Sequence, residues 1–143
     1  ANKLVNGYRT ELKNFTKSLK SISPVKVFVY DSGKDTPFTA GRFAMPTALI
    51  EAAGGNNIMD DFKKSWGTVT WEEVVDRNPE VIVIVNYGKV TAKQKREFMM
   101  SNPAFANLDA VKNDRFVTLE YVEATPGPRN IKAIKKLARA FRN

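Results

Sequence analysis

The sequence contains no cysteine and no histidine among its 143 residues. Their absence excludes thiol chemistry, zinc sites built from Cys and His, and catalysis by an imidazole from within this chain. Long apolar runs are also missing. None approaches the roughly 20 residues that a helix needs to span a bilayer, and no signal-peptide pattern is present. Any function must therefore rest on other polar, charged and aromatic side chains.

Acidic residues are few relative to basic ones. The chain has 23 Lys and Arg against 15 Asp and Glu, which gives a net charge of +8. Such a surplus can indicate nucleic-acid binding. The basic residues are dispersed, however, and most fall on the polar faces of expected helices: Lys13, Lys17, Lys20, Lys63, Lys64, Lys93, Lys95, Arg96, Lys132, Lys135, Lys136, Arg139 and Arg142. We therefore expect no nucleic-acid interface, because an anionic small ligand or simple solubility explains the surplus equally well.

What the sequence does have is the composition of one globular domain. Hydrophobic residues make up 43% of the chain, which suits a domain of this length with a core of its own. The first residue is Ala1 rather than Met, so we expect a processed chain or a piece of a longer protein.

Helix and strand patterns alternate along the chain. Apolar residues at helical spacing predict an amphipathic first helix: Leu4, Tyr8, Leu12, Phe15 and Leu19. Runs rich in β-branched residues predict strands at 25–30, 81–85 and 115–119. We expect a loop at 31–38 and a short helical turn or loop at 103–108. Strands separated by helices predict an α/β fold in three layers, an open parallel sheet with helices on both faces.

The segment from 46 to 85 carries the clearest local signals. Pro46 suits the start of a helix, and Gly54 and Gly55 are expected to end it. Thr70 and Glu73 have the spacing of a capping box, with Val69 and Val74 at the spacing of a hydrophobic staple. Pro79 disfavours helical geometry in Asn78. The run Val81–Val85 then lacks alternation, which is typical of a strand covered on both faces.

Enzymatic motifs are weak. The chain has neither a Walker-type phosphate loop nor Gly-x-Gly-x-x-Gly. The adjacent acidic pairs Asp60-Asp61 and Glu72-Glu73 do not form acid–base dyads, because sequence neighbours do not face each other in a helix or a strand. A stand-alone flavodoxin-like or Rossmann-like enzyme domain that binds a nucleotide remains an alternative at this point.

A set of short motifs occurs in a recognisable order: Thr39-Ala40-Gly41-Arg42, Ala53-Gly54-Gly55, Asn57-Ile58, Trp66, Val69-Thr70-Trp71-Glu72, Asn78-Pro79-Glu80-Val81-Ile82, Leu108–Phe116 and Gly127-Pro128-Arg129. No single motif is specific. Together they span almost the whole chain. In this order, they resemble the C-terminal lobe of the substrate-binding proteins of ABC importers for iron–siderophores, haem or cobalamin. These proteins form the helical-backbone metal receptor family.

This resemblance implies a two-lobe protein with the ligand in the cleft. Residues 1–23 would be the C-terminal part of the helix between the lobes and 24–143 the C-terminal α/β lobe, so the N-terminal lobe would be missing here. It implies a binding protein, not an enzyme, without a resident cofactor or metal. The protein would be extracytoplasmic, periplasmic or lipid-anchored, with signal and anchor outside this chain. Its partners would be an ABC permease and a metal chelate or corrinoid; without histidine, haem is the less favoured ligand.

Five residues are candidates for ligand binding. Arg42 follows Gly41 at a helix entrance and offers a planar fork to oxyanions, although it could be a plain surface residue. Trp66 could stack on a ligand or pack at the sheet edge. Tyr87 and Tyr121 follow expected strand ends, where ligands of open α/β sheets bind. Arg129 lies near the start of the last helix, where exposed amides favour an anion.

Glu72 is the candidate for docking to the permease. A carboxylate in the first turn of a helix is stabilised by the helix dipole, which alone could explain it. The resemblance implies a second role, because the Glu at this place on each lobe of the family pairs with an Arg of the permease. Glu73 is better explained as the partner in the capping box.

Overall fold

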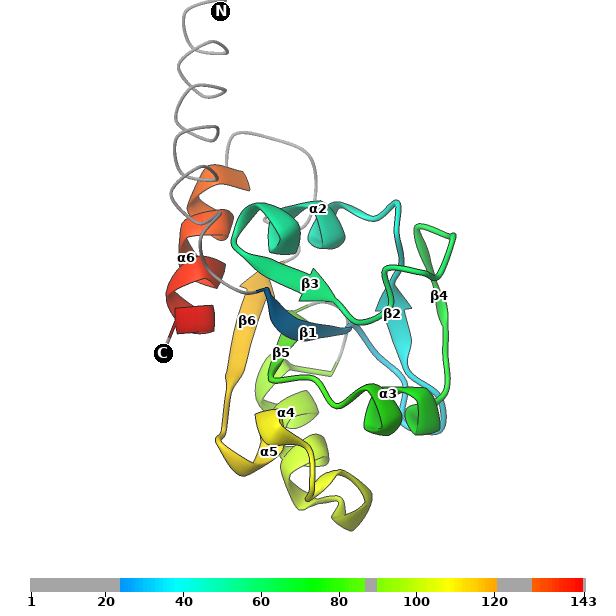
Figure 1. The fold of residues 1–143 in the computed structure, drawn as a ribbon. Helices are drawn as coiled ribbons and strands as arrows, with labels where there is room; N and C mark the ends of the chain where they lie inside the picture. The colour runs from blue at the N-terminus through cyan, green and yellow to red at the C-terminus, as the bar shows by residue number, and fades with distance from the viewer. Residues whose placement is uncertain (1–23, 87–89, 121–129, 143) are drawn as a thin grey trace, which may run out of the picture.

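The structure, a computed structural model, describes residues 24–86, 90–120 and 130–142 (Figure 1). The expected first helix and its apolar stripe from Leu4 to Leu19 lie outside these ranges. Three of the candidate ligand residues, Tyr87, Tyr121 and Arg129, also lie outside them. Within the described ranges, no helix combines the length and the apolarity that crossing a bilayer requires.

Four parallel strands form the central sheet. These are β1 (Val25–Tyr30), β3 (Gly55–Asn57), β5 (Val81–Asn86) and β6 (Phe116–Glu120), in the order β3-β1-β5-β6. All five residues of the run 81–85 are buried. This explains the continuous apolar pattern of β5, since a central parallel strand is covered on both faces.

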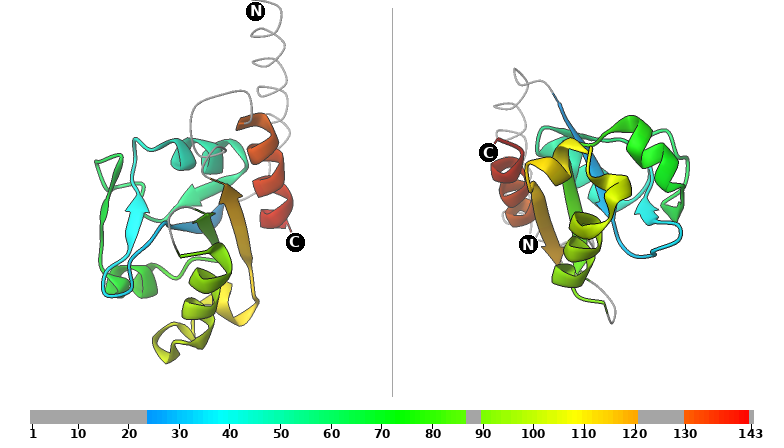
Figure 2. Two further views of the ribbon diagram at one scale, coloured as in Figure 1. Left: turned by 180° about the vertical axis from the view of Figure 1, so that it is seen from behind. Right: turned by 90° about the horizontal axis from the view of Figure 1, so that it is seen from below.

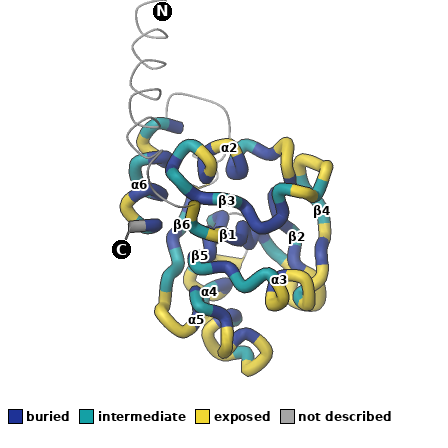
Figure 3. Tube along the Cα trace, in the orientation of Figure 1, coloured by how far each residue is buried: buried dark blue, intermediate teal, exposed yellow. Residues whose placement is uncertain are grey.

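Helices cover both faces of this sheet (Figures 1 and 2). On one face, α2 (Met45–Ala52) and α6 (Asn130–Arg142) bury Val81, Val83 and Val85 of β5. On the other, α3 (Trp71–Arg77), α4 (Ala92–Ser101), a short 3-10 helix (Pro103–Phe105) and α5 (Asp109–Lys112) bury Ile82 and Ile84. The three-layer α/β fold expected from the sequence is thereby confirmed, and Figure 3 shows the buried residues concentrated along the strands.

A second, two-stranded sheet was not predicted. Strand β2 (Phe38–Ala40) pairs antiparallel with β4 (Trp66–Thr68). Phe38 therefore belongs to a strand and not to the expected loop. The expectation that Gly55 ends a helix is also wrong in detail: α2 ends at Ala52, Gly54 has φ of 94°, and Gly55 opens β3. Such strands are three residues long, too short to produce a recognisable alternation of apolar and polar residues.

The predicted helix boundaries are set largely by caps. The Thr70 hydroxyl accepts a hydrogen bond from the Glu73 amide at 3.2 Å. Helix α3 ends at Arg77, and its C-cap residue Asn78 has a left-handed φ of 45° before Pro79. Val69 and Val74, the expected staple, are both buried in the same cluster. These contacts fix where α3 begins, and therefore where Glu72 lies in its first turn.

Candidate ligand-binding and docking sites

The carboxyl edge of the parallel sheet is the natural place to look for a ligand. Strands β5 and β6 end side by side at Asn86 and Glu120. The Asn86 amide nitrogen donates to Glu120 Oε2 at 3.0 Å, and Asn86 Oδ1 accepts from the Ala92 amide at 3.3 Å. Asn86 thus connects the end of two strands to the first turn of α4.

Two buried charged residues lie near the carboxyl edge of the sheet. Asp31, directly after β1, is 8% exposed, and Lys95 of α4 is 2% exposed. The Lys95 ammonium donates to the Val85 carbonyl at 2.9 Å. Burial raises the pKa of Asp31, opposed by the Ser32 hydroxyl at 3.1 Å and by the charge of Lys95. Burial likewise lowers the pKa of Lys95, opposed by the charge of Asp31.

Lys95 corrects one expectation from the sequence. It was grouped with the basic residues of polar helix faces, whereas its side chain reaches the end of β5. A lysine can be placed in this way because its long apolar stem packs against neighbours while the ammonium finds polar partners. The helical spacing separates the two lysines: Lys95 lies three residues after Ala92 and four before Met99, on the face of α4 that packs on the core, whereas Lys93 is exposed.

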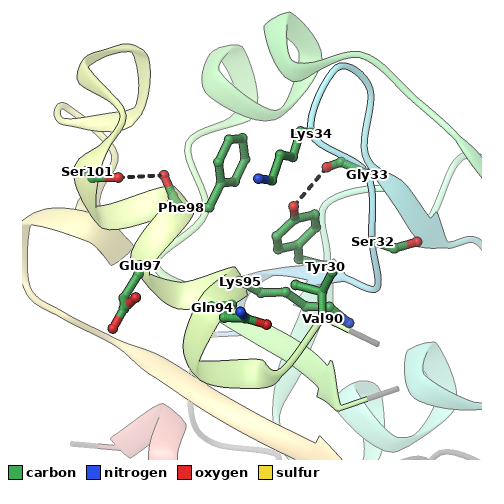
Figure 4. Close-up of a pocket in the computed structure, with 10 residues that line it drawn as sticks. All are labelled: Tyr30, Ser32, Gly33, Lys34, Val90, Gln94, Lys95, Glu97, Phe98 and Ser101. Atoms are coloured by element: carbon green, nitrogen blue, oxygen red, sulfur yellow. Dashed lines mark hydrogen bonds between the residues drawn. The ribbon is translucent and has the colours of Figure 1, made fainter. Parts of the chain in front are cut away.

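A hollow of about 420 Å³ opens between the loop after β1 and helix α4 (Figure 4). The Tyr30 hydroxyl donates to the Gly33 carbonyl at 2.8 Å, and burial raises the pKa of Tyr30 to about 12. The Lys34 ammonium lies 5.9 Å from the centre of the Phe98 ring. The hollow thus combines aromatic surface with a neutral hydroxyl and a nearby ammonium group.

The turn Gly41–Ala44 joins β2 to α2 at the same edge. Three successive amides of the turn donate to carbonyls of the segment 62–65: Gly41 to Ser65 at 2.8 Å, Arg42 to Phe62 at 2.9 Å and Phe43 to Lys64 at 3.3 Å. From the other side, the Thr47 hydroxyl donates to the Gly41 carbonyl at 2.6 Å. The turn is therefore held on both sides.

Arg42 itself is exposed. Its guanidinium lies 3.6 Å from Glu51, and the two side chains are 53% and 48% exposed. An ion pair with this exposure contributes little to stability, so the guanidinium can turn to an incoming anion at small cost. This geometry is compatible with the predicted ligand contact and does not by itself establish it.

Trp66 has a packing partner in the chain. Its ring stacks on Phe38 with centroids 5.9 Å apart and an angle of 6° between the planes, and it packs against the core beside α2. The alternative of packing at a sheet edge is thus seen directly. A ligand contact by the half-buried remainder of the indole stays a prediction.

Glu72 lies in the first turn of α3 and is exposed, next to the exposed Glu73. A second hollow, of about 390 Å³, lies beside Glu73, and Glu73 and Arg77 are among the residues that line it. Arg77 forms a bidentate pair with Asp61 at 2.7 and 3.0 Å, and this hydrogen bonding lowers the pKa of Asp61. Among the described residues, no group of three or more acidic side chains is arranged to hold a metal ion.

Comparisons with known proteins agree with this architecture. The model of the periplasmic binding protein family matches residues 1–123. The chain belongs to the periplasmic binding protein family. A substrate-binding lipoprotein of an ABC transporter from Bacillus subtilis, YvrC, is 26% identical over 145 residues, which are 99% of this chain and 44% of that protein.

Two solved structures extend the likeness. A periplasmic binding protein from Veillonella parvula is 32% identical, with a TM-score of 0.87 over 97% of this chain and 49% of its own. A possible iron-binding, periplasmic solute-binding protein from Staphylococcus epidermidis is 26% identical, with a TM-score of 0.83 over 99% of this chain and 55% of its own. The chain thus spans about half the length of such relatives, and the comparisons do not favour the stand-alone enzyme alternative.

Proposed function

We propose that the whole protein is the solute-binding component of an ABC importer and that this chain is its C-terminal lobe. It would capture a metal chelate, such as an iron–siderophore or a corrinoid, between this lobe and an N-terminal lobe. The observation that carries the proposal is the family match across residues 1–123, together with an open parallel sheet of the kind that binds ligands at its carboxyl edge. The location would be extracytoplasmic, either periplasmic or on a lipid anchor.

A binding role fits the carboxyl edge better than catalysis does. Asp31 is buried beside Lys95, and Glu120 is hydrogen-bonded to Asn86. A general acid or base must reach the proton that it transfers; Asp31 is buried, and the exposed Glu120 is already hydrogen-bonded to the Asn86 amide. Among the described residues, these two carboxylates are thus engaged within the chain, which supports a binding role.

The proposed ligand contacts follow from position. Arg42 offers an exposed guanidinium on a fixed turn. In the sequence, Tyr87 and Tyr121 come directly after β5 and β6, and Arg129 comes directly before α6. A chelate with anionic oxygens would suit the guanidinium groups, because charge-assisted hydrogen bonds are stronger than neutral ones. Trp66 remains a proposed contact for the edge of a large ligand.

The ligand can be identified directly. Purifying the whole protein from its native membrane or periplasmic fraction and analysing the bound material by mass spectrometry and visible absorption should reveal a metal chelate. A bound nucleotide without a metal would contradict the proposal and support the enzyme alternative.

Glu72 is proposed to dock on the permease. Its carboxylate is exposed at the start of α3, where a permease arginine could form charge-assisted bonds with it. We expect Glu72→Ala in the whole protein to change ligand affinity by less than about threefold. Uptake should fall strongly, because losing one partner of a desolvated pair costs about 2–5 kcal/mol.

The matched control for docking is Asp76→Ala, which removes an exposed carboxylate one turn later on the same helix. Uptake of the labelled ligand by cells carrying each variant is the measurement. Equal uptake by the Glu72→Ala and Asp76→Ala cells would remove Glu72 from the docking role.

A further inference from the structure

A tryptophan side chain joins the loop after β1 to the start of helix α3. Residues 33–36 are the exposed tip of this loop, which follows the carboxyl end of β1. The indole nitrogen of Trp71, the first residue of α3, donates to the Lys34 carbonyl of the tip at 2.7 Å. The next residue is Glu72, the proposed docking carboxylate. Trp71 therefore connects the carboxyl edge of the sheet to the helix that carries Glu72.

The loop tip has a defined shape and a second attachment beside the first. Gly33 has a φ of 95°, and a Cβ atom there would clash with the Thr36 carbonyl oxygen, so the tip is a tight turn that requires glycine. The Tyr30 hydroxyl donates to the Gly33 carbonyl at 2.8 Å (Figure 4). The rings of Tyr30 and Trp71 pack edge to face, with centroids 5.4 Å apart. Two adjacent carbonyls of the tip thus accept hydrogen bonds from two rings that contact each other.

Other aromatic residues hold the Trp71 ring in place. Its centroid lies 4.6 Å from that of Phe105, 6.0 Å from Phe98 and 6.1 Å from Phe28. Phe28 and Phe105 are buried, and tilted or edge-to-face contacts of this kind are favourable beyond the area that they bury. The Trp71 ring therefore has one well-defined orientation. A displacement of the tip at Lys34 cannot leave the first turn of α3 unaffected while the indole hydrogen bond persists.

We infer that Trp71 is a positioning residue through which a ligand at the carboxyl edge strengthens the docking of Glu72 on the permease. This inference rests on the proposed function and deepens it by naming how that site is regulated. A ligand that contacts the tip 33–36 favours the state in which the Lys34 carbonyl is bonded to Trp71, and the same bond restrains the first turn of α3. By linkage, ligand and permease each raise the affinity of the protein for the other by the same factor.

Packing and hydrogen bonding by Trp71 can be separated by substitution. Trp71→Phe keeps an aromatic ring in the cluster and removes the donor to Lys34. The Lys34 position is exposed, so its carbonyl can bond to water instead and the cost in stability should be small. Phe105→Leu does the opposite, because it loosens the packing on Trp71 and keeps the indole N–H. Tyr30→Phe removes only the hydroxyl that is bonded to the tip.

The test measures how tightly the whole protein binds its permease, held in lipid nanodiscs, with and without a bound chelate. A ferric hydroxamate, a ferric catecholate and cobalamin are the probes, and the one that binds most tightly is used. In the parent protein the chelate should raise the affinity for the permease by at least about fivefold. In Trp71→Phe this increase should fall below about twofold, while the affinity for the chelate alone changes by less than about threefold.

The companion variants are measured in the same way. Tyr30→Phe should also reduce the increase, because the tip then moves more freely relative to Trp71. Phe105→Leu should lower the melting temperature and keep the increase of the parent protein. Hydrogen–deuterium exchange gives a second readout that does not need the permease. In the parent, the chelate should slow exchange both in the tip 33–36 and in residues 71–74, and in Trp71→Phe it should slow exchange in the tip alone.

The possible failures are distinguishable. An increase in permease affinity that is the same in Trp71→Phe as in the parent, or a parent that docks equally well with and without the chelate, would overturn the role of Trp71 and leave the importer proposal standing. Equal losses in Trp71→Phe and Phe105→Leu would show that packing of the aromatic cluster, and not the indole hydrogen bond, is responsible. If none of the probes binds, the proposed function falls together with this inference.

Discussion

At the residue scale, the hydrogen bonds of buried polar side chains position the carboxyl edge of the sheet more than any exposed side chain does. Asn57, which is fully buried, donates to the Ala40 carbonyl and to the Thr47 hydroxyl at 2.8 Å, and accepts from the Met59 amide at 3.0 Å. One side chain thus connects β2, α2 and the loop after β3. The motif Asn57-Ile58 was singled out from the sequence, but only the structure shows that its role includes holding the turn that carries Arg42.

Replacing Asn57 should therefore destabilise the fold. In Asn57→Ala the buried partners lose their hydrogen bonds, and we expect the free energy of unfolding in urea to fall by about 2–4 kcal/mol. Asn56→Ala, at the less buried preceding position of β3, is the control and should change it by less than about 0.5 kcal/mol. A similar effect of both substitutions would show that the Asn57 network is not what holds this region.

Asp31 should give stability a pH dependence of predictable sign. Its pKa in the folded state is raised above the ordinary 3.8. Between pH 3.8 and the folded-state pKa, the folded state keeps a proton that the unfolded state has released. The stabilisation from this group is therefore complete below pH 3.8 and is lost as pH rises through the folded pKa.

The measurement is the free energy of unfolding of the parent and of Asp31→Asn from about pH 3 to about pH 7. The variant should become more stable relative to the parent as pH rises through this window, because asparagine does not titrate. Asp35→Asn, at an exposed position of the following loop, is the control. A difference that stays constant or shrinks with rising pH would contradict the assignment.

At the element scale, caps and long apolar runs were predictable and short strands were not. Thr70 and Pro79 mark the two ends of α3 through local hydrogen bonding and sterics, so their effect is visible in the sequence. Strands β2 and β4 have three residues each, and their pairing depends on contacts between distant segments. The same holds for the hydrogen bond of Lys95 to the end of β5 and for the rigidity of the turn 41–44.

The N-terminal caps of α3 and α4, at Thr70 and Thr91, should differ in strength. At Thr91 both halves of the capping box are formed, since the hydroxyl accepts from the Gln94 amide at 3.2 Å and the Thr91 amide donates to the Gln94 side chain at 2.9 Å. We expect Thr91→Ala to lower the free energy of unfolding by about 1 kcal/mol. Thr91→Ser, which keeps the hydroxyl, should cost much less. Equal losses in the two variants would show that the methyl group, not the hydroxyl, stabilises α4.

At the scale of the whole molecule, the chain forms three layers, and its parallel strands β1, β5 and β6 end at Tyr30, Asn86 and Glu120. The likeness to full-length periplasmic binding proteins covers 44% and 49% of two of them. In the proposed function, this chain would supply one wall of a ligand cleft. The order of motifs in the sequence was enough to predict the family and the fold, whereas the hydrogen bonds that hold the turn Gly41–Ala44 required the structure.

The ligand is proposed to bind at the carboxyl edge of the sheet. Hydrogen–deuterium exchange of the whole protein, with and without a bound ferric chelate, tests this most directly. Slower exchange is expected in residues 31–45 and 90–94, and no change in residues 109–116 at the opposite edge. Protection confined to 109–116, with 31–45 exchanging as before, would contradict the account.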